Sequence, residues 1–108
     1  MSFGQGDVVV AGDPFGRSPR RPYLLVSNER RPFRGEDYLV AGITTTERED
    51  AVPLADGLGV GDLDRESYVS PWTVLTIRHT NVTKRIAVVT REVVIETVEA
   101  IGTYVALQ

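Results

Sequence analysis

The segment RRPYLLVSN, from Arg20 to Asn28, carries the clearest structural signal in this sequence. Its apolar centre, Tyr23–Ser27, is short and follows Pro22, a pattern typical of a buried strand. Arg21 therefore stands at the mouth of that strand, beside a rigid residue. Because an arginine stays charged at any working pH and grips phosphate with a planar fork, the segment predicts an anion-binding group at a strand end.

A second segment, YLVAGITT, runs from Tyr38 to Thr45 and predicts another apolar strand. Three successive hydroxyls, Thr44, Thr45 and Thr46, follow its apolar part. If the two strand ends meet, a guanidinium and a hydroxyl lie on one phosphate. From chemistry alone, this is a phosphate-binding hypothesis of low specificity.

The rest of the chain predicts more short strands, separated by turn-forming residues. The predicted strands are Gly6–Ala11, Ala51–Leu54 (an edge, because of Pro53), Tyr68–Val69, Trp72–Ile77 and Arg85–Val89. The predicted loops are Gly12–Arg20, Asn28–Gly35 and Ala55–Glu66. Short strands with frequent turns favour a small antiparallel barrel, so the predicted fold class is mainly β with a C-terminal helix.

The helix is predicted from Arg91 to Tyr104, with Thr90 as its N-cap. Apolar residues spaced as on one helix face predict which side packs against the barrel: Val94, Val98, Ile101 and Val105.

The length of 108 residues predicts a single domain, residues 1–108. No run approaches the roughly 20 apolar residues of a membrane span, and the N-terminus lacks the features of a signal peptide. There are no cysteines, which removes disulfides and thiolate chemistry. These features favour a cytoplasmic protein with no membrane partner.

The net charge of −3 is unevenly distributed. Residues 17–34 hold six arginines and one acid, a local charge of +5, and the rest of the chain carries −8. A basic segment on an acidic body suggests an anionic partner met by one face, and we expect this segment to form it. The alternative is that the arginines only keep two loops soluble.

Several other patterns favour structural interpretations. The run Gly57–Gly61 lacks the Lys-Ser/Thr pair and the following helix of a phosphate-binding loop, so a flexible loop between strands is expected. A solvated acidic loop is the favoured interpretation of the acids Asp62, Asp64 and Glu66. A zinc site is almost excluded with one histidine and no cysteine.

Two aromatic residues leave alternatives open. His79, the only histidine, follows a strand in a polar stretch, and a solvated loop residue is favoured over a catalytic base. Trp72, the only tryptophan, is either a core anchor, which we favour, or an exposed platform on which a base stacks.

Taken in order, the motifs resemble the PemK/MazF family of type II toxin–antitoxin endoribonucleases. The matching elements are a Gly-Asp-Val-hydrophobic strand, an Arg-Pro-hydrophobic strand, a strand ending in Ile-Thr, a Ser-x-Val element, a Thr-Ile pair and a closing helix. In this sequence they are Gly6–Val10, Arg21–Asn28, Ile43-Thr44, Ser67–Val69, Thr76-Ile77 and the helix from Arg91. The resemblance covers nearly the whole chain from Gly6 onward.

The resemblance implies an SH3-like β-barrel that works as a homodimer. It implies a sequence-selective endoribonuclease, with no metal and no cofactor, that cuts single-stranded RNA such as mRNA and is blocked by a cognate antitoxin. Its catalytic residues correspond to Arg21 and Thr44. The candidate RNA-binding residues are Arg17, Arg20, Ser70, Trp72 and Arg78.

One departure matters for activity. Some members carry an arginine and an aspartate just after the Ser-x-Val element, where this sequence has Ser70 and Trp72. Two alternatives therefore stay open: a catalytically silent SH3-like module that binds RNA or protein, and a toxin of the same fold that acts on a protein such as DNA gyrase.

Overall fold

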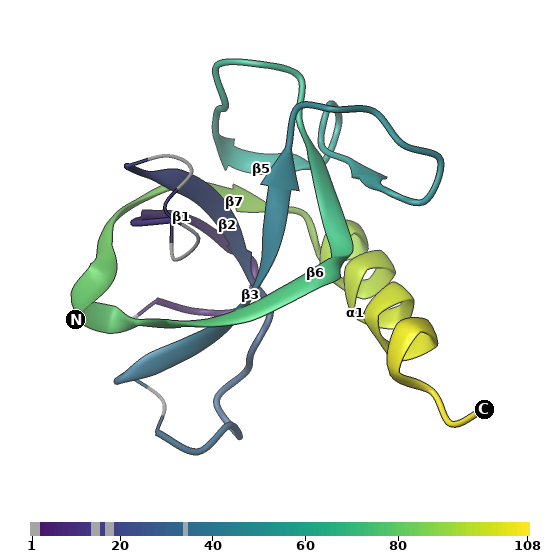
Figure 1. The fold of residues 1–108 in the computed structure, drawn as a ribbon. Coiled ribbons are helices and arrows are strands. Elements are labelled where there is room, and N and C mark those ends of the chain that lie inside the picture. The colour runs from purple at the N-terminus through teal and green to yellow at the C-terminus, as the bar shows by residue number, and fades with distance from the viewer. Residues whose placement is uncertain (1–2, 14–15, 17–18, 34) are drawn as a thin grey trace.

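The computed structural model describes residues 3–13, 16, 19–33 and 35–108, which form a curled antiparallel half-barrel with a helix against one end (Figure 1). The strands are β1 (Asp7–Ala11), β2 (Arg21–Leu25), β3 (Asp37–Thr44), β4 (Val52–Pro53), β5 (Leu58–Gly61), β6 (Tyr68–Arg78) and β7 (Val82–Val89). The helix α1 spans Arg91–Val105, and a 3₁₀ turn, His79–Asn81, joins β6 to β7. The sheet order is β4-β6-β3-β2-β1-β7-β5, and the predicted fold class is confirmed.

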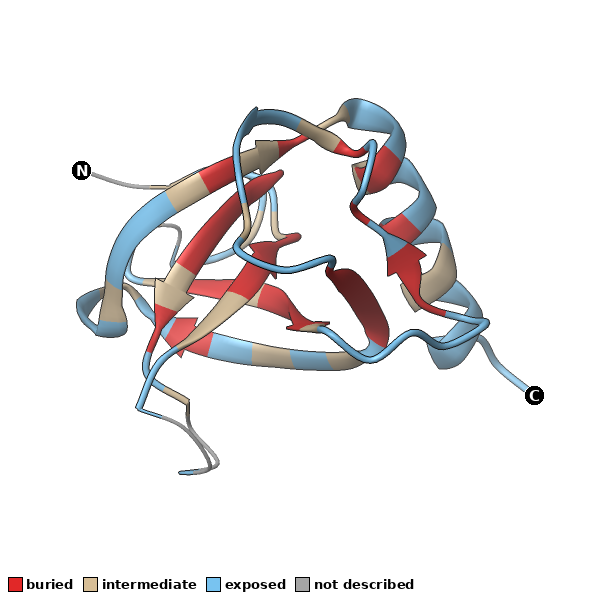
Figure 2. Ribbon diagram, turned by 90° about the horizontal axis from the view of Figure 1, so that it is seen from above, coloured by how far each residue is buried: buried red, intermediate tan, exposed pale blue. Residues whose placement is uncertain are grey.

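The central strands are buried on both faces, which explains their unbroken apolar sequences. Successive side chains of a strand point to opposite faces, so neighbouring residues enter different clusters. Leu24 packs with Val8 in the cluster that α1 covers, whereas Leu25 packs with Val9 in the cluster on the other face. Figure 2 shows these buried strands enclosed by an exposed outer rim.

Two predicted boundaries are wrong. The two strands predicted after Ser67 are one long strand, β6, which bends at an irregularity in its pairing with β3. The glycine-rich run predicted as a loop contains β5, paired with β7 at the edge of the sheet. Gly61 has φ +81°, and a Cβ there would lie 2.3 Å from the carbonyl oxygen of Ile86, so close approach of two strands explains this glycine.

The helix begins as predicted, because the side chain of Thr90 accepts a hydrogen bond from the backbone N–H of Val93. Its buried residues are Val93 and Thr97, whereas Val98 and Val105 of the predicted stripe are 43% and 75% exposed. A Cβ on Gly57 would lie 2.5 Å from Val93 Cγ2, so the missing side chain of Gly57 makes room for Val93. The predicted stripe is half right, because Val94 and Ile101 do pack against the core cluster, while the packed face is centred on Val93 and Thr97.

Within the described residues, no helix combines the length and the apolar character needed to cross a bilayer.

Candidate functional site

The pairing of β2 with β3 places Arg21 opposite Thr44. These strands run antiparallel with Tyr23 opposite Gly42, and two more steps along this register bring Arg21 level with Thr44. Side chains directly opposite each other in an antiparallel pair lie on the same face, about 5 Å apart at Cβ. The two strand ends therefore lie next to each other, and the guanidinium of Arg21 reaches the backbone carbonyl of Ile43, the residue before Thr44.

A groove of about 280 Å³ opens over this pair. It collects residues from β2, β3, β6 and the loop after β3. They are Arg21, Tyr23, Gly42, Ile43, Thr44, Thr46, Arg48, Ser70, Trp72 and Thr73. Four of the residues predicted from the sequence, Arg21, Thr44, Ser70 and Trp72, thus share one cavity.

An irregularity in β6 shapes one wall of the groove. Ala41 pairs with Val74 and Gly42 with Ser70, so residues 71–73 have no partner on β3. A Cβ on Gly42 would lie 3.2 Å from Thr73 Cγ2, so the glycine lets the bulged segment approach. Bulges of this kind re-aim side chains and are common beside active sites.

Trp72 is carried outward by this bulge. It is 40% exposed, so its assignment to the core is wrong. Its ring meets that of Tyr104 of α1 edge to face, with centroids 6.3 Å apart. An exposed indole held in place by a second ring is the arrangement needed to stack on a base.

The two candidate catalytic side chains are held by backbone contacts. Arg21 Nη2 donates a hydrogen bond of 3.2 Å to the carbonyl of Ile43, and Thr44 Oγ1 accepts one of 3.1 Å from the N–H of Thr46. Among the described residues, no carboxylate forms an ion pair with Arg21. The remaining N–H groups of its fork therefore stay available for an anion.

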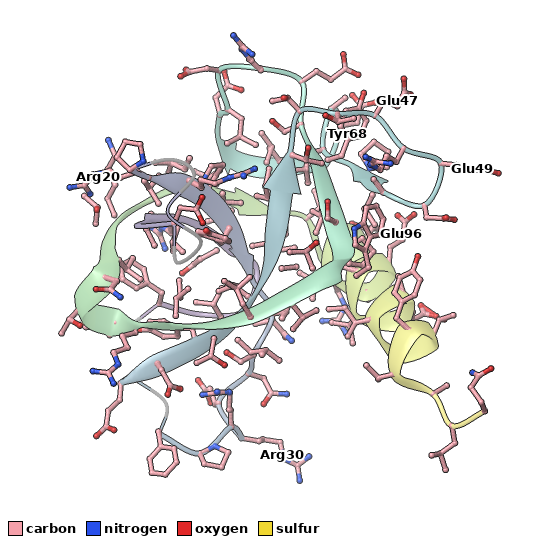
Figure 3. All side chains as sticks on the ribbon, viewed as in Figure 1. Arg20, Arg30, Glu47, Glu49, Tyr68 and Glu96 are labelled. Atoms are coloured by element: carbon pink, nitrogen blue, oxygen red, sulfur yellow. The ribbon has the colours of Figure 1, made fainter. Side chains whose placement is uncertain are left out.

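The basic segment does not form one surface, contrary to the prediction. Arg20 and Arg30 point away from opposite ends of the molecule in Figure 3. Arg20 is exposed and donates a hydrogen bond to Thr83 Oγ1 on β7, while Arg31 forms an ion pair with Asp37 at the other end of β2 and β3. Arg17 lies outside the described residues. Among the described arginines of the segment, Arg21 alone lines the groove.

Arg78 is also remote from the groove. It stands at the far end of β6, opposite Asp37, six residues beyond Trp72 or about 20 Å at the usual rise of a strand. The structure therefore does not bring Arg78 together with Arg21 and Thr44.

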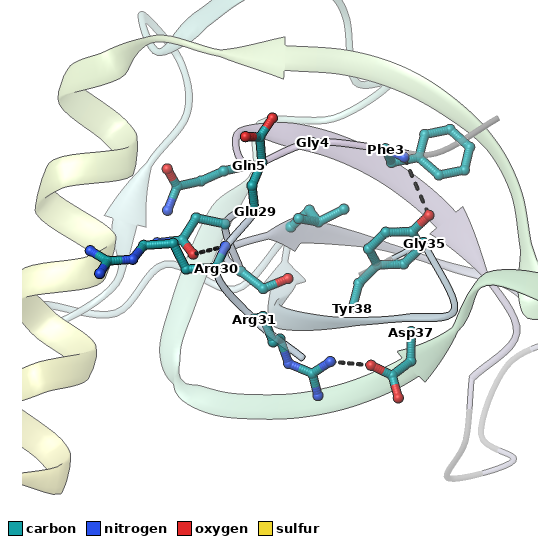
Figure 4. A pocket seen from close by; sticks show the side chains of 12 residues that line it. Phe3, Gly4, Gln5, Glu29, Arg30, Arg31, Gly35, Asp37 and Tyr38 are labelled. Atoms are coloured by element: carbon teal, nitrogen blue, oxygen red, sulfur yellow. Dashed lines mark hydrogen bonds and ion pairs between the residues drawn. The ribbon is translucent and has the colours of Figure 1, made fainter. Parts of the chain in front are cut away.

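A larger cavity, of about 960 Å³, lies at that far end (Figure 4). Its wall includes the Arg31–Asp37 ion pair and Tyr38 but none of the predicted site residues. The hydroxyl of Tyr38 and Nδ1 of His79 are hydrogen-bonded at 2.7 Å, and Phe3 packs on both rings. His79 is thus a structural residue of this end, and its interpretation as a solvated loop residue is wrong.

Near the groove, Tyr68 of β6 is opposite Thr44 and is buried. Its burial raises the pKa of its hydroxyl, and the hydrogen bond it donates to Glu66, with the negative charges of Glu47 and Glu66, raises that pKa further. Tyr68 therefore stays protonated and acts here as a hydrogen-bond donor.

The sequence interpretation did not identify Arg48 as a groove residue. Its loop has no fixed periodicity, so nothing in the sequence gives the direction of its side chain. The available signal was its position, four residues after Thr44, in the loop that continues the hydroxyl run.

The half-barrel and the closing helix are shared with solved structures of MazF-type toxins. The chain is similar to the toxin MazF-mt6 of Mycobacterium tuberculosis, with 28% identity and a TM-score of 0.74 over 94% of this chain and 98% of that one. It is also similar to an endoribonuclease in complex with its cognate antitoxin from a mycobacterial species, with 21% identity and a TM-score of 0.76 over 99% and 96%.

A third similar structure is MazE–MazF from Deinococcus radiodurans, with 16% identity and a TM-score of 0.75 over 100% and 99% of the two chains. No protein-family model matches the sequence, and no curated protein matches it at a significant level. The resemblance to the PemK/MazF family is therefore confirmed by the structure, whose fold is that of the MazF toxins.

Proposed function

We propose that this protein is the endoribonuclease toxin of a type II toxin–antitoxin pair, and that it cuts single-stranded RNA without a metal ion. The observation that carries the proposal is the register that sets Arg21 opposite Thr44 in a groove, on a chain with the MazF fold. The names of the similar structures, a MazF toxin and an endoribonuclease with its antitoxin, support the same function.

In the proposed reaction, the ribose 2′-OH attacks the adjacent phosphorus and the bond to the 5′ oxygen breaks. The 2′-OH proton leaves to solvent, and the departing oxygen takes a proton delivered through Arg21. The products are a 2′,3′-cyclic phosphate and a 5′-OH end. Arg21 stabilises the charge that grows on the phosphorane, an effect worth about 3–4 kcal/mol of barrier for a fixed donor.

Thr44 has a positioning role in this mechanism. Because its Oγ1 already accepts from the N–H of Thr46, its hydroxyl hydrogen is directed elsewhere, and in the groove it donates to the phosphate. Ser70 stands level with Gly42 on the neighbouring strand and lines the same groove. Trp72, exposed at the rim, stacks on a base of the bound strand.

The proposed partners are a cognate antitoxin and a second copy of the chain. Exposed apolar residues on α1, among them Ile95, Val98 and Tyr104, provide a surface that association would cover. Light scattering at micromolar concentration tests the homodimer, and a mass that stays near 11.9 kDa on concentration argues against it. The proposed location is the cytoplasm, where mRNA is available.

Incubation with a defined single-stranded RNA in EDTA, followed by analysis of the product ends, tests the proposed activity. Cyclic phosphate and 5′-OH ends are expected. RNA binding without cleavage would instead indicate a silent binding module. Growth arrest on expression with intact RNA would point to a protein target such as DNA gyrase.

A further inference from the structure

Arg48 shares the groove with Arg21, although it comes from the loop between β3 and β4. Two arginines thus line one cavity of about 280 Å³. Like charges in one groove repel each other, and this arrangement is unfavourable unless an anion lies between or beside them. The geometry by itself therefore favours a ligand with more than one negative charge.

The neighbours of Arg48 make this observation stronger. Glu47, Glu49 and Asp50 flank it in the sequence, yet within the described residues Arg48 forms no ion pair with any of them. Two arginines elsewhere in the described part of the chain are compensated, Arg31 by Asp37 and Arg85 by Asp7. An arginine that has three acids at hand and still faces a cationic groove is available to an external anion.

Arg48 also lines a second cavity, of about 550 Å³, which adjoins the groove. Its other walls are the acids Glu47, Glu49 and Asp50 and the aromatic pair Trp72 and Tyr104. Arg48 therefore stands at the boundary between the scissile-phosphate groove and the aromatic pair. Because Arg48 and Trp72 line both cavities, a strand that has its scissile phosphate on Arg21 and a base on Trp72 lies beside Arg48.

We propose that Arg48 binds the phosphate next to the scissile one and so holds the RNA strand between Arg21 and Trp72. This inference rests on the proposed function and adds a contact that the sequence motifs did not include. Arg48 is a positioning residue here. It binds the strand equally before and during the reaction, whereas Arg21 acts on the phosphorus that reacts.

This role predicts a division between affinity and rate. Loss of a charge-assisted contact in Arg48→Ala should weaken RNA binding by about tenfold. The slope of log affinity against log salt should become shallower by about 0.7, the value for one contact to a single-stranded phosphate. The single-turnover rate at saturating protein should stay within about threefold of wild type, because uniform binding does not enter the chemical step.

The binding measurement uses a fluorescent single-stranded oligonucleotide that is 2′-O-methylated throughout, so that no 2′-OH can attack. Arg48→Lys should keep the salt slope and recover part of the affinity, since a lysine is a point charge without the planar fork. Arg65→Ala is the matched control, because Arg65 is an exposed arginine that lines neither cavity, and it should leave both quantities unchanged.

Each outcome decides the proposal. An unchanged affinity and slope in Arg48→Ala overturns it, and so does a large fall in the saturated rate with normal affinity, which would place Arg48 on the scissile phosphate. If wild type binds the methylated strand but fails to cut the unmodified one in EDTA, the proposed function fails while the Arg48 contact is still judged by binding. If wild type binds neither the methylated nor the unmodified strand, the proposed function and the Arg48 contact both fail.

Discussion

An arginine and a cavity lie at each end of the β2–β3 pair, Arg21 at the start of β2 and Arg31 in the loop that joins β2 to β3, but the two ends differ in how charge is arranged. At the Arg21 end the cavity is small, about 280 Å³, and its two guanidinium groups have no carboxylate partner among the described residues. At the Arg31 end the cavity is larger, about 960 Å³, and Arg31 is neutralised by Asp37 and also donates to Thr76. Uncompensated charge, rather than cavity size, identifies the candidate site.

The same comparison explains the chemistry of each end. The Arg21 end places hydroxyls beside the cations, as phosphate binding requires. The Arg31 end places an aromatic cluster, Phe3, Tyr38 and His79, beside an internal ion pair, which closes that end of the sheet. Mutations at equivalent places in the two ends should therefore have opposite consequences, with activity lost at one and stability lost at the other.

The largest difference is expected between Arg21→Ala and Arg31→Ala. Removing Arg21 takes away the fixed donor to the phosphorane and should lower the single-turnover rate by about 10²–10³-fold, while the melting temperature stays near wild type. Arg21→Lys should recover little, because a point ammonium lacks the bidentate grip. Arg31→Ala should cut RNA within a few-fold of wild type. Equal rates for Arg21→Ala and Arg31→Ala would refute the assignment of the site.

The variant Thr44→Ala tests the contribution of the hydroxyl that lines the groove with Arg21. Loss of the hydroxyl that orients the phosphate should reduce the single-turnover rate by about tenfold or more, on the scale of one lost charge-assisted hydrogen bond. The appropriate control is Thr45→Ala, since Thr45 is exposed and lies outside the groove. Thr46 lines the groove and is therefore unsuitable as a control. A slower Thr45→Ala than Thr44→Ala would contradict the register argument.

At the other end, His79→Ala should reduce stability and spare activity. The hydroxyl of the buried Tyr38 loses one of its two partners and keeps the N–H of Phe3, so the change should cost about 1 kcal/mol in urea unfolding. Tyr38→Phe should cost more, because it removes the contacts of the hydroxyl with both His79 and the Phe3 N–H. The double variant should show a coupling of about 1 kcal/mol, because the Tyr38–His79 hydrogen bond is lost in either single variant. A hundredfold loss of cleavage in His79→Ala would instead make it a general acid or base.

The sequence predicted the groove residues that stand on regular strands. Arg21 and Thr44 were found because the period of a strand and its flanking proline fix where strand ends lie, and the register then brings them together. The prediction that residues 17–34 form one basic surface was wrong, because the net charge of a segment does not show that strand β2 holds its two halves apart. Likewise, the bulge that exposes Trp72 and the small residue that admits Val93 depend on contacts between distant segments.

The smallest effect is expected for Tyr68→Phe, a hydroxyl at the groove end that is not in the groove. The raised pKa of Tyr68 means that the folded protein holds this proton more tightly than the unfolded chain does. Stability from this group is therefore present below the ordinary tyrosine pKa of about 10 and is lost as pH rises beyond it, when the unfolded chain releases its proton first. Urea unfolding at about pH 8 and about pH 11, on either side of that value, measures the loss. Tyr68→Phe should lose less stability between the two conditions than wild type, and its cleavage rate should be normal at neutral pH.

Tyr104→Phe, altered on the exposed face of α1, should follow the wild-type pH dependence. If Tyr68→Phe instead slows cleavage as much as Thr44→Ala does, then any polar change at this end impairs the site, and the function cannot be assigned to the facing pair of Arg21 and Thr44.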